Sequence, residues 1–590
     1  MIGKIIGIEG NTVLVNLSIN LEETKNIINL YVLFDDGDKK YVGEIADIKN
    51  NTAYINLIGE LINNSFTYGI SKKPSFKSIP QLIREDKINY VIGMSDYTER
   101  KYLYMGKSPI YDQVDIGVNI NNFFSNHFAI FGSSGSGKSC SVARIIQNLY
   151  EKQQSIAYNS SLLIFDAYGE YHQAFETINT KCSDINFKAY TTNVKDDKTP
   201  IVKIPLWILT VDDMALLLDA KKRTDLPIIE KAMKLVTIFA KEEQEVIKIK
   251  NDIIARALLD VLSSGKNSSQ IRDQVFSILA HYYTKDLNLE TQIVQPGYIR
   301  TLKQCLLVDA SGKITEMELL TNFMNSFLLE NVDLFLPDGT FKYTLKDLYN
   351  AFEFALISEG IFSSDKVFDD YNTIKVNLRN LMNGDYAKYF DVEEYIDLDN
   401  FIKSILLTSD GKKAQLINFN INYVDDRFAK TLTKIYSKIF FEYTKNLKER
   451  ASLPINIILE EAHRYVQNDT DIDIIGYNIF DRIAKEGRKY GTMLGLISQR
   501  PSELSTTALS QCNNFLIFKI LHPTDVDFVK QMVPNITEEI IKKMKYLQPG
   551  NCIAFGSGFK LPSLIRFDMP DPSPSSSNCD VSKIWFIDRN

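Results

Sequence analysis

The feature that most constrains the fold is a glycine-rich segment that follows a short apolar run. Residues 127–131 read His-Phe-Ala-Ile-Phe, and residues 132–139 read Gly-Ser-Ser-Gly-Ser-Gly-Lys-Ser. Apolar residues then recur at helical spacing, at Val142, Ile145, Ile146 and Leu149. The segment therefore predicts a buried strand, a tight turn and a helix. The positions that match the phosphate-binding P-loop pattern G-x-x-x-x-G-K-[ST] are Gly132, Gly137, Lys138 and Ser139.

This pattern indicates a site for ATP and Mg²⁺. Glycines let successive backbone N–H groups face one anion at the positive end of the following helix. Lys138 would reach the β- and γ-phosphates, and the Ser139 hydroxyl would occupy one Mg²⁺ position. A flexible Gly/Ser loop is the alternative, but the strand and the helix around it argue against that. The residues expected to bind the nucleotide are Gly132, Ser133, Ser134, Gly135, Ser136, Gly137, Lys138, Ser139 and Cys140.

A second group of candidate residues follows the buried strand predicted at 456–459. Two adjacent carboxylates, Glu460 and Glu461, come at the end of this predicted strand, and ligands of open α/β sheets bind at the carboxyl ends of strands. Glu460 would hold Mg²⁺, mainly through water, and Glu461 would orient the attacking water. The alternative is a solvated helix start, where acidic residues are favoured anyway. The preceding P-loop favours the catalytic interpretation.

Two further candidates flank the strand predicted over residues 492–498. Gln499 would sense the γ-phosphate, although a side chain that merely caps the strand is nearly as good an interpretation. Arg488 lies in a turn that Gly487 and Gly491 would allow. There it would act on the nucleotide of a neighbouring subunit as an arginine finger. The alternative is a cation that complements a helix dipole.

The order of patterns along the chain predicts an α/β protein with several parts. Short strands with Asp/Gly/Asn turns over residues 1–90 favour a small β-barrel. Strands and helices then alternate, which is typical of a parallel sheet. We expect a core in two pieces, 91–205 and 401–567, interrupted by a helical insertion over 206–400. Residues 568–590 form a Pro/Ser-rich tail whose apolar tip, residues 584–587, is either a latch onto a neighbouring subunit or a frayed end.

Composition narrows the cellular setting. The six cysteines are scattered without a C-x-x-C pair, which fits reduced thiols in a cytoplasmic protein and argues against a zinc site. No apolar run approaches 18 residues, so we expect no membrane segment. The net charge is −7, and any contact with nucleic acid must therefore come from a local basic surface.

Five motifs in this order resemble those of the HerA-type ATPases, a family of P-loop translocases related to FtsK. They lie at residues 132–139, 165–171, 459–463, 483–491 and 498–501. The resemblance implies a RecA-like core, a homohexameric ring and ATP-driven movement along double-stranded DNA in its pore. It also implies an effector partner, such as a NurA-like nuclease or a Sir2-like antiviral protein. Asn126 stands where the family often has a basic residue, and the roles of Asp166 and Glu170 stay open.

Two other functions are compatible with the same motifs. One is an ATPase that drives secretion or protein remodelling, as the conjugation ATPases do. The other is a scaffold in which hydrolysis only switches assembly. The expected lack of a membrane anchor and the N-terminal β-region weaken the secretion alternative. Stimulation of the ATPase by duplex DNA would separate the alternatives.

Overall fold

The computed structural model describes the chain except residues 22–25, 38, 63–64, 84–87, 90, 93–100, 112–113, 153–154, 331–340, 359–364, 534–535, 537, 576–580 and 586–590. The chain forms two compact units. The first, here called the core unit, comprises residues 1–200, 402–469 and 478–590. The second, the helical unit, comprises residues 201–401 and 470–477. None of the helices in the described part combines the length and the apolar character that a membrane crossing requires.

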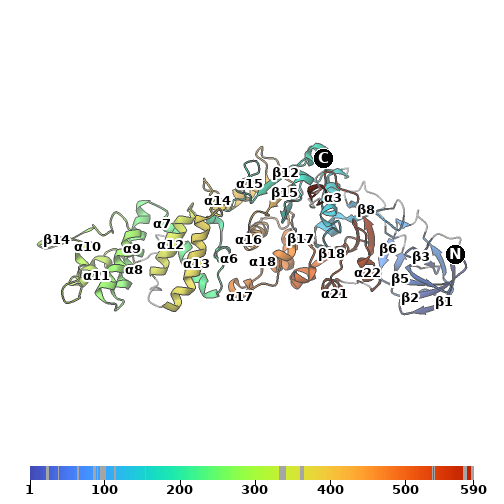
Figure 1. The fold of residues 1–590 in the computed structure, drawn as a ribbon, viewed down its shortest axis with the longest axis horizontal. Coiled ribbons are helices and arrows are strands. Elements are labelled where there is room, and N and C mark those ends of the chain that lie inside the picture. Colours follow the sequence, from blue (N-terminus) through green and yellow to red (C-terminus); the bar gives the residue numbers. More distant parts are fainter. Residues whose placement is uncertain are drawn as a thin grey trace. The chain divides into compact units, whose positions relative to one another are not determined.

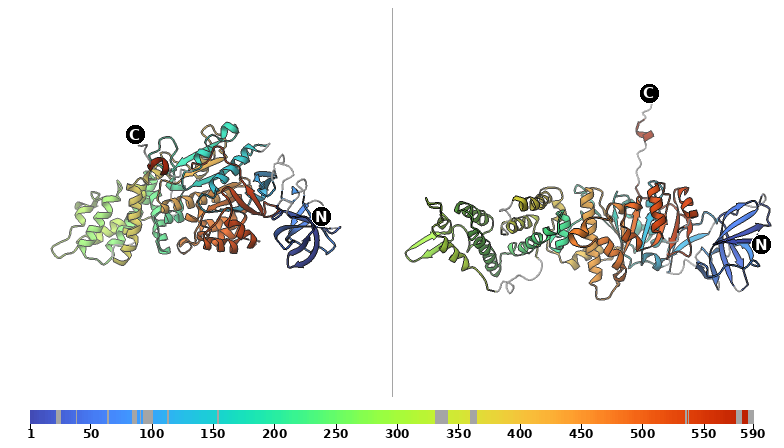
Figure 2. Two further views of the ribbon diagram at one scale, coloured as in Figure 1. Left: turned by 45° about the vertical axis from the view of Figure 1, so that its right-hand side comes forward. Right: turned by 90° about the horizontal axis from the view of Figure 1, so that it is seen from below.

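The N-terminal part of the core unit is an antiparallel sheet of seven strands (blue in Figures 1 and 2). Alternate residues are buried along its strands, as expected for a sheet with one apolar face. The N–H of Ile2 donates to the carbonyl of Pro80 at 2.9 Å, which links the two ends of the strand order. The order is β1-β2-β5-β4-β3-β7, with β6 beside β5. The strands are β1 Gly3–Glu9, β2 Thr12–Leu17, β3 Tyr31–Asp35, β4 Lys40–Lys49, β5 Thr52–Ile62, β6 Ser65–Tyr68 and β7 Ile79–Leu82.

The remainder of the core unit is built on a mixed sheet of eleven strands. The order is β12-β15-β11-β16-β17-β10-β18-β19-β20-β8-β9, parallel from β12 to β18 and antiparallel beyond. Strand β17 thus separates the strand before the P-loop from the strand that carries the two carboxylates. The strands are β8 Tyr102–Lys107, β9 Asp115–Asn119, β10 His127–Phe131, β11 Leu162–Asp166, β12 Phe187–Thr191, β15 Leu416–Asn420, β16 Ile455–Leu459, β17 Thr492–Ser498, β18 Cys512–Ile517, β19 Asn551–Gly556 and β20 Ser563–Arg566.

The central strands are fully buried because helices cover both faces of the sheet. Every residue of β10, β11, β16 and β17 is buried, which accounts for their continuous apolar runs. Helix α3 packs against the face that carries Phe128 and Ile130. On the other face, Tyr436 of α16 contacts the rings of Phe165 and Phe419. The sheet therefore lies in a three-layer arrangement, within the α/β class that the sequence predicted.

The helices of the core unit follow the strands in chain order. They are α2 Ile120–Phe124, α3 Lys138–Glu151, α4 His172–Phe175, α5 Ile178–Lys181, α16 Asp426–Lys445, α18 Ile479–Arg482, α19 Arg488–Tyr490, α20 Thr506–Ser510, α21 Pro523–Met532, α22 Glu538–Lys545 and α23 Val581–Trp585. Short 3₁₀ turns occupy Ala462–Arg464 and Pro501–Glu503, and a π-helix occupies Ile483–Gly487.

The helical unit (green to yellow in Figure 1) contains a single β-hairpin among its described residues. Its core includes contacts between Phe239, Tyr282 and Phe354. The hairpin pairs β13 Gln292–Gln295 with β14 Tyr298–Thr301. The helices are α6 Val211–Leu217, α7 Leu226–Phe239, α8 Gln244–Leu262, α9 Ser268–His281, α10 Leu302–Cys305, α11 Met317–Asn325, α12 Leu345–Ser358, α13 Asp365–Asn383, α14 Ala387–Phe390 and α17 Asp471–Ile475, with 3₁₀ turns at Leu206–Ile208 and Arg223–Asp225. Helix α15, Leu398–Leu406, crosses from this unit into the core unit.

Candidate functional site

The glycine-rich loop between β10 and α3 follows a path that its glycines allow. Gly135 and Gly137 have positive φ angles of 72° and 94°, which side chains disfavour. A Cβ atom on Gly132 would lie 2.6 Å from the Cβ of Phe518, so this position also excludes a side chain. The N–H of Ser133 donates to the carbonyl of Lys519 at 2.8 Å, which ties the loop to the residues after β18. The strand and the helix expected on either side of the loop are both present.

Lys138 is the first residue of α3, and its ammonium group folds back over the loop. Its Nζ donates to the carbonyl oxygens of Gly132 at 2.6 Å and Ser133 at 3.2 Å. Burial lowers the pKa of Lys138, and the nearby Glu461 and Glu460 carboxylates partly offset this effect. The lysine is thus a buried cation at the head of the helix, beside the two carboxylates that the sequence singled out.

Glu460 and Glu461 directly follow β16 and differ in their surroundings. Burial, reinforced by the neighbouring Asp166 carboxylate, raises the pKa of Glu460 well above its ordinary value. Burial also raises the pKa of Glu461, but Lys138 opposes this rise. Glu461 has a left-handed backbone with φ of 47°, an unfavourable conformation for a glutamate. Strained residues of this kind persist where the surrounding structure holds them, often at functional sites.

Gln499 and Glu461 meet at the carboxyl ends of adjacent strands. The Nε2 of Gln499 donates to Glu461 Oε1 at 3.1 Å. Beside them, His463 Nδ1 lies 3.2 Å from Glu461 Oε2 and 3.1 Å from Ser498 Oγ. A cleft of about 250 Å³ opens here, and its lining includes Ser133, Ser134, Gln499, Arg500 and His522. Sequence reasoning placed Gln499 and Glu461 at this edge but assigned no role to His463 or Ser498.

The donor set at this edge fits a Mg²⁺ ion that also binds nucleotide phosphates. Glu460 Oε2 is buried and has no hydrogen-bond partner among the described residues. Burial raises the pKa of Glu170, and a hydrogen bond with Ser139 partly offsets the rise. In the described part of the chain, no three His, Cys, Asp or Glu side chains form a ready-made metal site. Such a site suits Mg²⁺, which keeps several waters and uses few protein ligands.

Asp166 contributes to the site through the backbone. It is fully buried at the end of β11, and its two carboxylate oxygens accept the N–H groups of Glu170, at 3.0 Å, and Tyr171, at 2.9 Å. Asn418 Nδ2 also lies 3.3 Å from Asp166 Oδ2. Asp166 therefore holds the turn that presents Glu170 to Ser139, and this accounts for the spacing of the motif at 165–171.

Arg488 lies at the amino-terminal ends of the parallel strands, whereas the P-loop lies at their carboxyl ends. It precedes β17, whose seven residues span about 20 Å, whereas Gln499 follows the same strand. Its side chain is exposed and forms no ion pair with any described residue. The sequence-based explanation of the turn is half wrong. Gly491 turns the chain with φ of 89°, but Gly487 is helical, and a Cβ atom there would lie 2.4 Å from the carbonyl oxygen of Thr492.

The start of the C-terminal tail is attached to the core unit. Gln147 of α3 donates from Nε2 to the carbonyl of Pro572 at 2.9 Å and accepts the N–H of Asp571 at 3.0 Å. The N–H of Ser575 donates to the carbonyl of Glu170 at 2.9 Å. Residues 571–575 are therefore a strap beside the candidate site and not a free linker. Of the predicted apolar tip, Phe586 and Ile587 lie outside the described residues.

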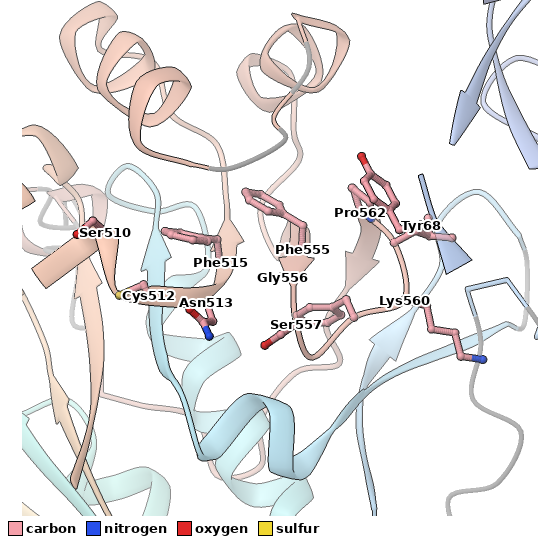
Figure 3. Close-up of a pocket in the computed structure, with 12 residues that line it drawn as sticks. Tyr68, Ser510, Cys512, Asn513, Phe515, Phe555, Gly556, Ser557, Lys560 and Pro562 are labelled. Atoms are coloured by element: carbon pink, nitrogen blue, oxygen red, sulfur yellow. The ribbon is translucent and has the colours of Figure 1, made fainter. Parts of the chain in front are cut away.

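A second cavity, of about 340 Å³, lies beside the start of β18, away from the P-loop (Figure 3). Phe515 of β18 and Phe555 of β19 stack there with ring centroids 5.6 Å apart. Tyr68 of β6 and Lys560 also line it. None of its lining residues belongs to the predicted nucleotide site, so the two cavities are separate.

Comparison with known proteins shows which family this chain resembles. Residues 103–323 match the family model described as the central domain of helicase HerA. The DNA double-strand break repair helicase HerA of Pyrococcus furiosus is 24% identical over 77% of this chain and 67% of its own length. A probable HerA of Methanocaldococcus jannaschii is 22% identical over 92% of this chain and 90% of its own. Among solved structures, the conjugative coupling protein TrwB covers 84% of this chain and 94% of its own, with 10% identity and a TM-score of 0.44.

An α/β sheet with a P-loop on its central strand defines a P-loop ATPase, an enzyme that hydrolyses ATP. Within that class, the matched family model and the curated relatives support a HerA-type ATPase, as the sequence motifs indicated.

Proposed function

We propose that the chain is an ATP-driven motor that moves along double-stranded DNA as a homohexameric ring. The observation that carries the proposal is the separation of Arg488 from the P-loop across the sheet. An exposed arginine at the end of the strands opposite the P-loop can assist hydrolysis only at a nucleotide that a neighbouring subunit holds. A ring of subunits gives every site such a neighbour. Relatives named as DNA double-strand break repair helicases support DNA as the track.

The site residues divide the hydrolytic work among them. Lys138 would exchange its carbonyl acceptors for oxygens of the β- and γ-phosphates, which bind a cation more strongly. Ser139 and Glu460 would hold Mg²⁺, which neutralises charge on the phosphates. Glu461 would orient the attacking water and accept its proton. Gln499, bonded to Glu461, would sense the γ-phosphate from β17.

The parts of the chain outside the ATPase core have roles of their own in this proposal. We propose that the RecA-like core carries the N-terminal sheet as a small barrel used in assembly. In this proposal the parts are divided as expected from the sequence, with the helical insertion at 206–400 and the tail at 568–590. An effector protein, such as a NurA-like nuclease or a Sir2-like protein, would use the motion in DNA repair or antiviral defence in the cytoplasm.

The test is the ATPase rate of the purified full-length protein with and without long linear duplex DNA. We expect stimulation at about 50 mM salt that fades towards about 200 mM, because phosphate contacts release counterions. The Lys138→Ala protein controls for contaminating ATPases. Displacement of a third strand from a triplex would report movement along the duplex. A hexamer, verified by native mass spectrometry, whose ATPase ignores DNA at low salt would favour secretion or protein remodelling instead.

A further inference from the structure

The carboxylate of Glu461 is approached by a different side chain at each oxygen. Gln499 Nε2 donates to Oε1 at 3.1 Å, and His463 Nδ1 lies 3.2 Å from Oε2. Glu461 is 7% exposed, so water cannot replace these contacts freely. In this structure Oε2 has no hydrogen bond of normal geometry among the described residues. A buried carboxylate oxygen therefore stands next to a histidine nitrogen that is close but not yet aligned with it.

The neighbours of His463 favour the tautomer with its proton on Nδ1. Nδ1 also lies 3.1 Å from Ser498 Oγ, and that oxygen already accepts the N–H of Arg500 at 2.9 Å. The Ser498 hydroxyl could donate to a bare Nδ1, but the nitrogen lone pair would then lie 3.2 Å from the Glu461 carboxylate, which is unfavourable. An Nδ1–H group can instead donate to either oxygen. Burial lowers the pKa of His463, so the ring is neutral near pH 7 and carries this one proton.

We propose that His463 is a positioning residue for Glu461. The Nδ1–H group of His463 donates its hydrogen bond either to Ser498 Oγ or to Glu461 Oε2. When it donates to Oε2, while Gln499 holds Oε1, the carboxylate is fixed at both oxygens. Because Ser498 and Gln499 are consecutive residues at the end of β17, a shift of this strand end would change both contacts together. The inference rests on the proposed role of Glu461 in orienting water, and it adds the group that sets the orientation.

The backbone of His463 does not depend on its imidazole. Gln467 Nε2 donates to the carbonyl of His463 at 2.6 Å, and the N–H of Arg464 donates to the carbonyl of Glu461 at 2.8 Å. The short 3₁₀ turn therefore keeps its own hydrogen bonds when the side chain is replaced. This allows the side chain to be tested without removing the turn.

The decisive comparison is between two amide replacements. In His463→Asn the amide nitrogen can occupy the place of Nδ1, whereas in His463→Gln it reaches the place of Nε2. We expect His463→Ala and His463→Gln to lower kcat about 100-fold, the scale of a misplaced catalytic group. KM and the affinity for a fluorescent ATP analogue should change less than about 2-fold. His463→Asn should recover most of the rate. His281→Ala, an exposed histidine of the helical unit, serves as the matched control.

A double-mutant cycle separates this inference from the proposed role of Glu461. If His463 acts through Glu461, then His463→Ala should cost nothing further in the Glu461→Gln protein. A further tenfold loss in that background would overturn the inference, as would equal activity of the Asn and Gln variants. If Glu461→Gln alone keeps the wild-type rate, the role of Glu461 fails first. An unchanged rate in His463→Ala would overturn the inference whatever Glu461 does.

Discussion

Gly137 of the P-loop and Gly550, which precedes β19, approach so closely that no side chain fits between them. A Cβ atom on Gly137 would lie 2.7 Å from the nitrogen of Gly550. That nitrogen donates its hydrogen to the carbonyl of Ser136 at 3.0 Å. The loop that binds phosphate is therefore braced from behind by a segment near the end of the chain, and this brace is part of the site.

Gly137→Ala should therefore weaken nucleotide binding more than Gly135→Ala. Both residues have positive φ angles, which cost a side chain about 1–2 kcal/mol. At Gly135, however, a Cβ atom meets nothing within 4 Å, whereas at Gly137 it meets backbone. Equilibrium binding of a fluorescent ATP analogue checks the difference. We expect at least a tenfold larger loss for Gly137→Ala, and equal losses would argue against the brace.

Lys138→Ala should abolish hydrolysis and weaken nucleotide binding. Lys138 is a buried cation within the loop itself, and its ammonium group would contact the β- and γ-phosphates. Removal of one such charge-stabilising donor typically costs about 100-fold or more in rate. Steady-state ATPase assays and a binding titration measure the two effects. A variant that still hydrolyses ATP within about tenfold of wild type would exclude Lys138 from this role.

Glu461→Gln should keep ATP bound but unhydrolysed. The amide is isosteric with the carboxylate and cannot accept the proton of the attacking water, a loss worth about 10²- to 10⁴-fold. Retention of radiolabelled ATP after rapid gel filtration would report the trapped state. Should this variant turn over at the wild-type rate, Glu170, which lies beside Ser139, becomes the next candidate.

Arg488→Ala should leave folding, ring assembly and nucleotide binding largely intact while hydrolysis collapses. A finger acting in trans is worth about 10³- to 10⁵-fold, or roughly 4–7 kcal/mol of barrier, whereas a cation at a helix end is worth under about 1 kcal/mol. Rings that mix Arg488→Ala with Lys138→Ala subunits should recover activity, because one subunit offers the P-loop and the other the finger. Rings shown by native mass spectrometry to be mixed, yet inactive, would refute action in trans.

His127 should make the core unit sensitive to mild acid. Burial lowers its pKa to about 4, and the imidazole accepts the N–H of Leu494 at 2.9 Å. Below about pH 6.5 the unfolded chain binds a proton that the folded chain refuses, so the free energy of unfolding falls as the pH drops towards 4. The loss should reach about 2 kcal/mol at pH 5. Urea denaturation at pH 7.5 and pH 5 should show a smaller difference for His127→Asn, but an unchanged one for His281→Asn.

The sequence predicted those parts of the site that local patterns encode. Strand β10, the loop and α3 follow from one continuous stretch, and apolar runs predicted the strands that end at Asp166, Leu459 and Ser498. Because parallel strands end at one edge, Glu461 and Gln499 could be placed together before the structure. Gly487 was misread because a glycine needed for close packing leaves the same trace in a sequence as one needed for a turn.

Other contacts of the candidate site depend on which strands are adjacent in the sheet. The periodicity of the sequence does not encode this strand order. The brace of Gly550 behind the P-loop, the approach of Asp166 to Glu460 and the pairing of His463 with Ser498 all join segments distant in sequence. A sequence signal for His463 did exist, since it lies within the motif at 459–463. Its partners could be named only once β16 and β17 were known to be adjacent.

The position of β10 in the sheet has a consequence for folding during synthesis. Both strands that pair with β10, namely β17 and β18, come much later in the chain. His127 of β10 accepts the N–H of Leu494, which is synthesised 367 residues later. At a synthesis rate of about 5–20 residues per second, that interval lasts roughly 20–70 s. During this interval the nascent chain exposes the apolar strand β10 with both of its edges unpaired, and such edges promote aggregation. Both edges of β10 are therefore paired only as the final third of the chain emerges.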